Sequence, residues 1–441
     1  MYKIGLYERE ITPLFGNSLC GYFNVRLVDG VKEKTYAKAV VIEKDDETVA
    51  MLAIDACESD SAIIAAIRER VKKFIDIKEE NIMISATHSH TAGPGTIDNV
   101  GVDAELDNFY LEWLVKVCAD TIVLAYQRRT EAKIKFTTTK ITGTTFVRNY
   151  RMKNGAVRTN PGIGNPDIIE PHGEVDYDAP MFFFEGPNGE NLGLMYSFGN
   201  HQDSVDGTQV SGDWSSVVSR RMKEKFGMDF ISIFFYGTAG NINQVDVKNK
   251  DADYNPLSNY HYFLGNTAAD ALIEAFASLK EIDGKISVIT DTKLYENRVM
   301  SFEEIAEQEK IFNSVTLPED MKLDAASPKE FFDACMARRA LNHTYSSPKY
   351  YPVKFQIIKI ADVMIFALPG EVFTQYGLKI KKAFPNNTCF FACLANNKWS
   401  YMPAPDCYFP ELYESLFGSA QFWPEDTADI FDHFIELGKK L

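Results

Sequence analysis

The sequence predicts a mixed α/β fold, in which largely parallel-stranded central sheets are flanked by helices. Short apolar runs alternate with longer segments of helical spacing through the first half of the chain, which is the order typical of α/β proteins. Several apolar runs end in loops that contain glycine together with histidine or glutamate. Because ligand sites of α/β folds lie beyond the carboxyl ends of strands, we expect the functional site there.

The clearest unit is a strand–helix–strand arrangement near the N-terminus. Residues 37–43 and 48–54 have the apolar character of strands, 62–74 have helical spacing, and 81–87 form another apolar strand. This order predicts a parallel pair joined by a crossover helix. The remaining predicted elements are a helix at 108–129, strands at 132–139, 181–185, 192–198 and 230–236, a helix at 215–226, strands at 353–360 and 363–368, and a helix at 373–384.

The 441 residues suffice for one large core or for two fused cores. We predict a single domain over residues 1–441, with two lobes (1–295 and 346–441) joined by a charged helical segment (296–345) as the alternative arrangement. Residues 154–173 are rich in Gly, Pro and Asn and too long for a simple turn, so we expect them to form a lip of the site.

Charge and composition exclude several classes of protein. The formal charge is −16 and the pI about 5.0, which argues against nucleic-acid binding, because phosphate contacts need clustered Lys and Arg. No run approaches the roughly 20 apolar residues of a membrane helix. The sequence starts without the basic and apolar regions of a signal peptide, so we expect a cytoplasmic protein, or a secreted one if a leader has been trimmed. The seven cysteines show no CxxC pair, which predicts reduced thiols in the core.

The strongest local motif is the pair His88 and His90, in the segment THSHTAGPG directly after the strand at 81–87. Two histidines one residue apart point to opposite faces of an extended strand, so a shared metal needs a turn, which Gly93 and Gly95 permit. Histidine is the commonest metal ligand, but it is also a common core or capping residue. The motif alone leaves a metal role and a structural role equally open.

His201 stands in a similar position, after the predicted strand at 192–198 and close to Gly199. A loop histidine bonded to the backbone is the plain interpretation. Its weight as a ligand rises because the chain has only seven histidines, and three of them directly follow strands. The other four are interpreted as surface or packing residues: His172, His261, His343 and His433.

Glu371 follows a strand and a Pro-Gly turn and opens the predicted helix at 373–384. A glutamate in a first helical turn is stabilised by the helix dipole and needs no functional reason. It becomes a ligand candidate only together with two histidines, a set that suits zinc and leaves a position open for water.

The Gly-rich segment 237–244 follows another apolar strand. Such a turn brings backbone N–H groups close to a ligand, which would suit an oxyanion or a phosphate. The segment lacks the Lys-Ser/Thr ending of a P-loop, so a nucleotide site is not expected.

Together these motifs resemble the N-terminal catalytic domain of the neutral, non-lysosomal ceramidase family, whose members are zinc amidases that cleave the N-acyl bond of ceramide. The resemblance runs over nearly the whole chain. Its segments are Ile11-Thr12-Pro13, Gly21-Tyr22, ATHSHT at 86–91, Gly93-Pro94-Gly95, Ser211-Gly212-Asp213-Trp214, Pro369-Gly370-Glu371 and 401–414.

The resemblance implies one zinc ion per chain, held by four side chains. The positions that match the family ligands are His88, His201, Glu371 and Tyr401. Tyr408, a little further along the chain, is the alternative to Tyr401 as the tyrosine ligand.

The resemblance also implies residues that act on the substrate. His90 matches a family residue that contacts the substrate or the activated water, and Tyr413 matches the second of a pair of tyrosines. Arg148 resembles the arginine near the scissile amide. Arg151 is the alternative, because Val147 stands where an asparagine is usual in the family.

The sequence departs from the family at residues 240–244, where it has Gly-Asn-Ile-Asn-Gln in place of Gly-Asp-Val-Ser-Pro. Asn243 falls at the position of a serine with a catalytic role. An amide is not a nucleophile, although it can orient water or donate to an oxyanion.

The sequence therefore predicts a zinc-dependent hydrolase that cleaves an amide (N-acyl) bond of a small-molecule or lipid-like substrate with an activated water. In this hypothesis His90 is a general acid or base, Tyr413 and Arg148 stabilise the oxyanion, and Asn243 is a positioning group. Two alternatives stay open. One is a catalytically altered or inactive homologue that acts as a binding protein, and the other is a hydrolase of a different bond, such as an ester.

Overall fold

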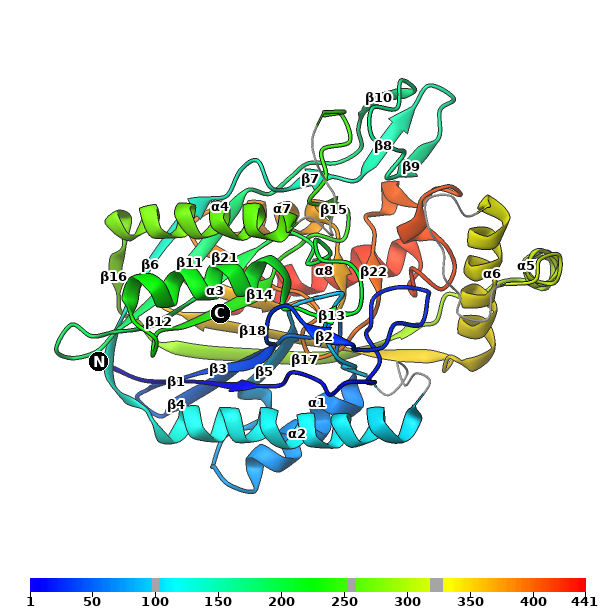
Figure 1. The fold of residues 1–441 in the computed structure, drawn as a ribbon. Helices are drawn as coiled ribbons and strands as arrows, with labels where there is room; N and C mark the ends of the chain where they lie inside the picture. The colour runs from blue at the N-terminus through cyan, green and yellow to red at the C-terminus, as the bar shows by residue number, and fades with distance from the viewer. Residues whose placement is uncertain (97–102, 252–258, 318–327) are drawn as a thin grey trace.

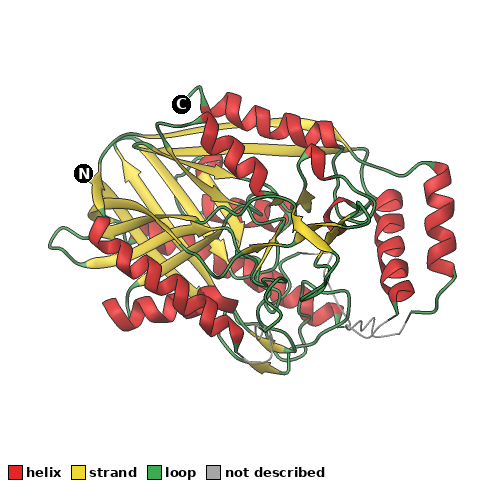
Figure 2. Ribbon diagram, turned by 90° about the horizontal axis from the view of Figure 1, so that it is seen from above, coloured by secondary structure: helices red, strands yellow, loops and turns green. Residues whose placement is uncertain are grey.

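The computed structural model describes residues 1–96, 103–251, 259–317 and 328–441. Its centre is a sandwich of two sheets with helices on both outer faces (Figures 1 and 2). In spatial order the first sheet contains β14 (Ile231–Tyr236), β12 (Asn191–Phe198), β11 (Asp178–Glu185), β6 (Thr130–Lys140), β1 (Tyr2–Glu10), β3 (Tyr36–Lys44), β4 (Glu47–Ile54) and β5 (Ile82–Ala86), with β16 (Lys280–Ile282) paired to β6. The second sheet contains β17 (Ile286–Glu296), β18 (Tyr350–Ile360), β19 (Val363–Ala367) and β21 (Thr388–Ala392).

The two sheets bury their inner faces against each other. Successive side chains of a strand point to opposite faces, so alternate residues enter this layer. The first sheet contributes, among others, Val40, Ile42, Met51, Phe182, Phe184 and Phe235, and the second contributes Ile358, Ile360, Ile365 and Phe390.

Helices cover the outer faces of the sandwich. The first sheet is covered by α2 (Ala104–Gln127), with α1 (Ser61–Lys72) beside it, and by α3 (Asp213–Phe226) and α4 (Tyr260–Glu274). The second sheet is covered by α7 (Thr374–Ala383) and α8 (Pro424–Gly438). The predicted strand–helix–strand unit is present as β4, α1 and β5, with β4 and β5 parallel. Asp60 starts α1, because its side chain accepts hydrogen bonds from the first N–H groups of the helix.

The prediction of a mixed α/β fold is confirmed, but the expectation of largely parallel sheets is wrong. Among the described strands of the two sheets, only β4–β5, β12–β14 and β19–β21 pair in parallel. Neighbours in sequence such as β3 and β4 are joined by short hairpins, which make antiparallel pairs. The three parallel pairs nevertheless position the candidate site, because His88, His201 and Glu371 each follow one strand of a different pair.

The segment expected to be helical contains α5 (Phe302–Asn313) and α6 (Lys329–Ser346), which pack against each other. They lie between β17 and β18, which are direct neighbours in the second sheet. The helical pair is therefore inserted between two adjacent strands. Figure 1 shows it at the end of the sandwich opposite the N-terminus.

The region expected to form a lip carries a small sheet of its own. It consists of β8 (Asn149–Met152), β9 (Val157–Thr159) and β10 (Ile168–Pro171), in the order β10-β8-β9. Figure 1 shows this sheet projecting from the body of the molecule.

Candidate metal centre

His88, His201 and Glu371 converge from three strand ends. His88 follows β5, His201 follows β12, and Glu371 begins β20 (Glu371–Val372) just beyond β19. The Nε2 atoms of His88 and His201 lie 3.2 Å apart, and Glu371 Oε2 lies 3.1 Å from the first and 3.4 Å from the second. All three side chains are buried. The expectation that Glu371 opens a helix is wrong, because α7 begins only at Thr374.

This donor set fits a metal ion. Glu371 Oε2 is buried and faces the two imidazole Nε2 atoms, which cannot donate to it when their protons are on Nδ1. His88 Nδ1 lies 2.8 Å from the carbonyl oxygen of Cys57, which requires a proton on Nδ1 and leaves the Nε2 lone pair directed at the centre. His201 Nδ1 lies 3.2 Å from the hydroxyl of Tyr236. Burial and the charge of Arg148 lower the pKa of His201 to about 3, so its imidazole is neutral. Two imidazole nitrogens and one carboxylate oxygen suit zinc.

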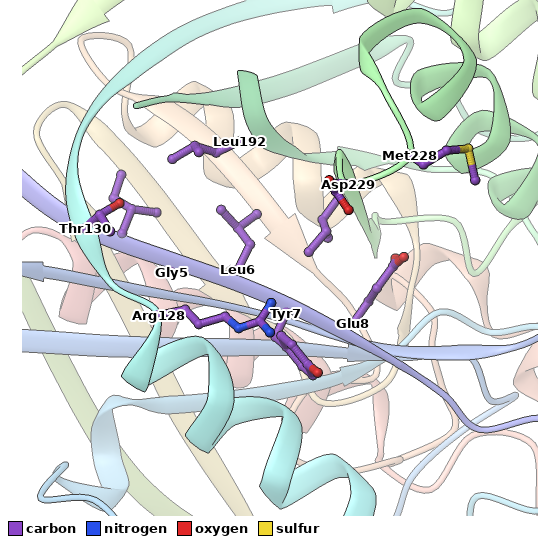
Figure 3. Close-up of a pocket in the computed structure, with 11 residues that line it drawn as sticks. Gly5, Leu6, Tyr7, Glu8, Arg128, Thr130, Leu192, Met228 and Asp229 are labelled. Carbon is purple, nitrogen blue, oxygen red and sulfur yellow. The ribbon is translucent and has the colours of Figure 1, made fainter. Parts of the chain in front are cut away.

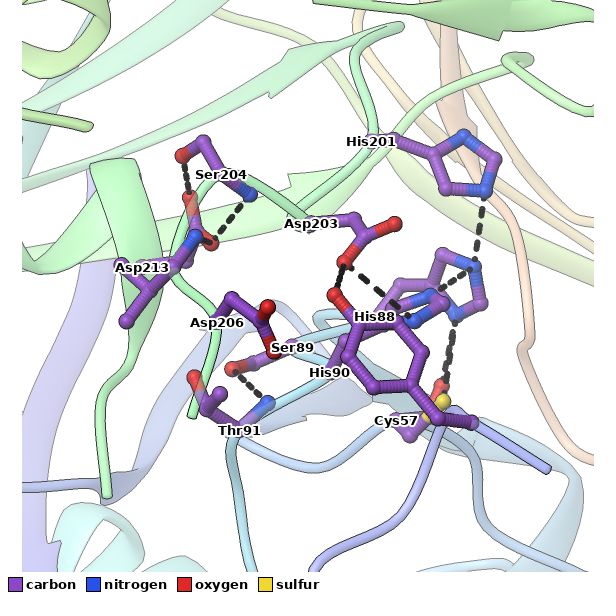
Figure 4. Close-up of polar contacts among 12 residues, drawn as sticks. Cys57, His88, Ser89, His90, Thr91, His201, Asp203, Ser204, Asp206 and Asp213 are labelled. Carbon is purple, nitrogen blue, oxygen red and sulfur yellow. Dashed lines mark hydrogen bonds and ion pairs between the residues drawn. The ribbon is translucent and has the colours of Figure 1, made fainter. Parts of the chain in front are cut away.

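The backbone at His88 explains how both histidines of the motif reach one place. His88 has φ of 71°, in the left-handed region that residues other than glycine rarely adopt. The turn that the pair requires therefore lies at His88 itself rather than at Gly93 or Gly95. As a result, His90 Nε2 lies 3.4 Å from His88 Nε2 (Figure 4). Backbone strain of this kind is concentrated at functional sites.

His90 lies between His88 and Asp203 (Figure 4). Its Nδ1 is 3.7 Å from Asp203 Oδ1, which also accepts a hydrogen bond from the hydroxyl of Tyr22. Arg26 packs over the Tyr22 ring at 3.9 Å and donates to the carbonyl oxygen of His90 at 2.6 Å. Burial and the neighbouring His88 hold the pKa of His90 well below its usual range. Sequence reasoning assigned no role to Asp203 or Arg26, although Asp203 stands only two residues after the candidate ligand His201.

Tyr401 lies beside Glu371, because β20 pairs in parallel with β22 (Tyr401–Met402) and places these two residues opposite each other. The Tyr401 ring is buried, with the guanidinium of Arg148 5.1 Å from its centre. Tyr408 instead donates its hydroxyl to the carbonyl oxygen of Phe422 at 3.0 Å. This geometry favours Tyr401 over Tyr408 as a fourth ligand.

Arg148, rather than Arg151, reaches the centre. Arg148 Nη1 lies 3.5 Å from His201 Nε2, and its Nε donates to the buried carboxylate of Glu414. Arg151 is exposed and lies 3.5 Å from the exposed Glu170. Arg148 is therefore the arginine that could contact a reacting carbonyl oxygen.

The side chain of Asn243 is engaged locally. It lies on β15 (Ile242–Asn243), which pairs with β7 (Phe146–Val147), the strand just before Arg148. Its Nδ2 donates to Asn160 Oδ1 at 2.6 Å, and its Oδ1 accepts from the N–H of Val245 at 3.0 Å. Within the described residues Asn243 has no hydrogen bond to the four candidate ligands. This geometry supports a positioning role for the loop around Asn160.

Tyr413 lies next to Tyr401, with ring centres 5.6 Å apart. Its hydroxyl accepts a hydrogen bond of 2.8 Å from Nη1 of Arg339, a residue of α6. The inserted helical pair therefore delivers a side chain to the edge of the centre. No motif in the sequence pointed to Arg339.

The histidines other than His88, His90 and His201 make other contacts, and His172 Nε2 lies 3.6 Å from Cys407 Sγ. His261 contacts Glu33 at 2.9 Å and His433 contacts Asp291 at 2.7 Å. All seven cysteines are free and buried. No helix in the described part of the chain is long and apolar enough to cross a membrane.

A surface groove lies away from this centre, along β1 (Figure 3). It shares no residue with the candidate ligands. Its lining includes Gly5, Leu6, Tyr7, Glu8, Arg128, Thr130, Leu192, Met228 and Asp229.

Comparisons with known proteins agree on one family. Neutral ceramidase of Oryza sativa subsp. japonica is 25% identical over 238 residues, and neutral ceramidase 1 of Arabidopsis thaliana is 25% identical over 243 residues. Each match covers 51% of this chain but only 29% of the relative, so the chain spans under a third of these curated proteins.

The fold matches that of a solved bacterial structure. The crystal structure of neutral ceramidase from Pseudomonas aeruginosa has a TM-score of 0.74 over 99% of this chain and 74% of that chain, at 18% identity. The family model described as neutral/alkaline non-lysosomal ceramidase, N-terminal, matches residues 2–255, more than half of the sequence. The chain belongs to the neutral/alkaline non-lysosomal ceramidase family.

Proposed function

We propose that this protein is a zinc-dependent hydrolase that cleaves the amide bond of a ceramide-type or related N-acyl substrate. The observation that carries the proposal is the convergence of His88, His201 and Glu371, with both imidazoles oriented through their Nδ1 atoms. We assign Tyr401 as the fourth ligand from its place opposite Glu371. Family membership supports an amide as the bond that is cleaved.

The chain's own residues would divide the chemistry between them. Zinc, when bound, supplies Lewis acidity and makes water nucleophilic at neutral pH. We assign His90 as the group that takes a proton from water and returns it to the leaving nitrogen, because its Nε2 faces the centre, 3.4 Å from His88 Nε2. Arg148 is fixed by Glu414 and can stabilise negative charge on the carbonyl oxygen. We place Tyr413 at the edge of the centre as a second group that can donate to this oxyanion.

The identity of residue 243 affects whether the carbonyl carbon is attacked by water or by a side chain of the protein. At this position the side chain offers no hydroxyl, so we propose that water attacks the carbonyl carbon directly and that no acyl-enzyme forms. The carbon–oxygen bond forms, the carbon–nitrogen bond breaks, and the proton lost by water goes to the nitrogen. We assign Asn243 the role of holding the Asn160 loop beside the site.

The test is metal analysis of the purified, untreated protein, together with hydrolysis of a panel of N-acyl substrates with and without a chelator. We expect about one zinc per chain and turnover that the chelator abolishes. His88→Ala and Glu371→Ala should lose both zinc and turnover. Tyr401→Phe should weaken zinc binding, whereas the matched variant Tyr408→Phe should not. Full zinc content and activity in either alanine variant would overturn the assignment.

The same assays, with one ester added to the panel, separate the two alternatives. Zinc binding without turnover of any substrate would favour a binding protein that has kept the scaffold. A matched ester and amide with the same acyl chain would show which bond is preferred, because both need the same activated water and the same oxyanion contacts.

A further inference from the structure

Arg339 is a cation at the edge of the centre that forms no ion pair with a carboxylate of the described residues. It is half-buried on α6. Its Nη1 donates to the hydroxyl of Tyr413 at 2.8 Å, and its Nη2 donates to Ser400 Oγ at 3.4 Å. Both partners are neutral hydroxyls, and neither Asp nor Glu pairs with it among the residues that the structure describes.

The four fully buried arginines of the described residues are used differently. Arg26, Arg68 and Arg298 all donate to main-chain carbonyl oxygens, which is a structural use of the guanidinium. Arg148 is paired with a buried carboxylate. Arg339 has neither kind of partner. Because a partly desolvated charge without a counter-charge is costly, an anionic ligand would offset this cost.

The position of Arg339 restricts where that anion would lie. Ser400 precedes the candidate ligand Tyr401, and the carbonyl oxygen of Ser400 accepts a hydrogen bond of 2.8 Å from the backbone N–H of Glu371. The Tyr413 ring packs next to the Tyr401 ring. Arg339 thus contacts the immediate neighbours of two proposed ligands. An anion bound to it would be separated from the reacting amide by only a short link.

We propose that Arg339 binds a carboxylate carried by the substrate close to its scissile amide, as in an N-acylated amino acid. This inference rests on the proposed function. A guanidinium matches a carboxylate with two parallel hydrogen bonds, which gives both strength and orientation. In a chain of net charge −16, Arg339 is a cation at the edge of the centre. Hydrolysis of such a substrate would consume one water and give the acyl carboxylate and the free amino acid.

The experiment compares zinc-loaded wild type with Arg339→Gln and Arg339→Lys on amides that each carry one linear twelve-carbon chain. N-lauroylglycine carries a carboxylate on the amine half, N-dodecylsuccinamic acid carries one on the acyl half, and N-lauroylethanolamine is the neutral reference. Wild type should prefer at least one of the two acids, and which one it prefers identifies the half that carries the charge. Arg339→Gln should lower the ratio of kcat/KM for that acid to that for the neutral amide by about 10- to 100-fold. Arg339→Lys should keep part of the preference.

Arg338→Gln is the matched control, because Arg338 is the exposed neighbour on the same helix. It should leave the ratio at the wild-type value. A folded, zinc-loaded Arg339→Gln protein with an unchanged ratio would overturn the inference.

A binding measurement keeps this inference separate from the proposed function. If wild type hydrolyses none of the three compounds, the proposed function fails, and the affinity for N-lauroylglycine is then measured by calorimetry. Binding at least about tenfold weaker in Arg339→Gln supports the anion site on its own. Equal binding by both proteins, or no binding by wild type, overturns it.

Discussion

Tyr236→Phe tests the metal centre without replacing any of the proposed ligands. The hydroxyl of Tyr236 lies 3.2 Å from Nδ1 of His201, and both side chains are buried. If Nε2 of His201 binds zinc, Nδ1 carries the proton and donates it to this hydroxyl. Removing the hydroxyl leaves a buried N–H without a partner and frees the ring to rotate.

The magnitude follows from the cost of that unpaired donor. An unsatisfied buried polar group costs about 1–3 kcal/mol, which corresponds to roughly a 5- to 140-fold loss of zinc affinity. Mutation of a residue that hydrogen-bonds to a metal ligand usually lowers metal affinity by about 10- to 100-fold, which is the same range. The assay is zinc competition with a chelator of known affinity, read as the dissociation constant of the protein.

The chain offers a matched control on the adjacent strand. Tyr196 is equally buried, but the structure describes no hydrogen-bond partner for its hydroxyl. Tyr196→Phe should therefore leave zinc affinity unchanged. If Tyr236→Phe binds zinc as tightly as wild type, or if both variants weaken it equally, the proposed orientation of His201 is wrong.

Three further predictions concern stability and zinc content. Zinc at a free concentration 100 times its dissociation constant should raise the free energy of unfolding by about 2.7 kcal/mol, and a chelator should reverse the gain; a midpoint of denaturation that ignores zinc would contradict this. Glu414→Gln, which leaves the buried charge of Arg148 unpaired, should cost about 3–5 kcal/mol in urea unfolding, against at most about 1 kcal/mol for the exposed Glu411→Gln. Gly240→Ala should disturb the centre, because its Cβ would lie 2.4 Å from the backbone oxygen of Glu371; unchanged zinc content would show that this turn can yield.

The candidate ligands could be predicted because each lies at a recognisable place, and because the chain has only seven histidines. His88 and His201 directly follow apolar strands, and Glu371 follows a strand and a Pro-Gly turn. The ends of strands can be predicted from a single sequence, since apolar runs stop where they meet polar or glycine residues. Whether neighbouring strands pair in parallel or antiparallel is harder to predict from a single sequence, and the sheets are mostly antiparallel.

The supporting residues could not be predicted, because their roles depend on contacts between distant elements. Tyr236 ends an apolar strand and reads as an ordinary core residue until the ring of His201 is placed beside it. Arg339 lies in a charged helix, where an arginine normally faces solvent. The role of Asp203 beside His90 becomes visible only in the folded chain, where the hydroxyl of Tyr22 donates a hydrogen bond to it.

The four candidate ligands come from the parts of the chain that build the two sheets of the sandwich, and this has a consequence for assembly. Two of them follow strands of the first sheet, whereas Glu371 and Tyr401 belong to the chain that builds the second. Residues 2–255, which the family model matches, include both histidines but neither of these two. A folding intermediate with only the first sheet formed would hold two ligands of four. Tight zinc binding would therefore require that the two sheets have already packed together. The bound ion would in turn stabilise the contact between them.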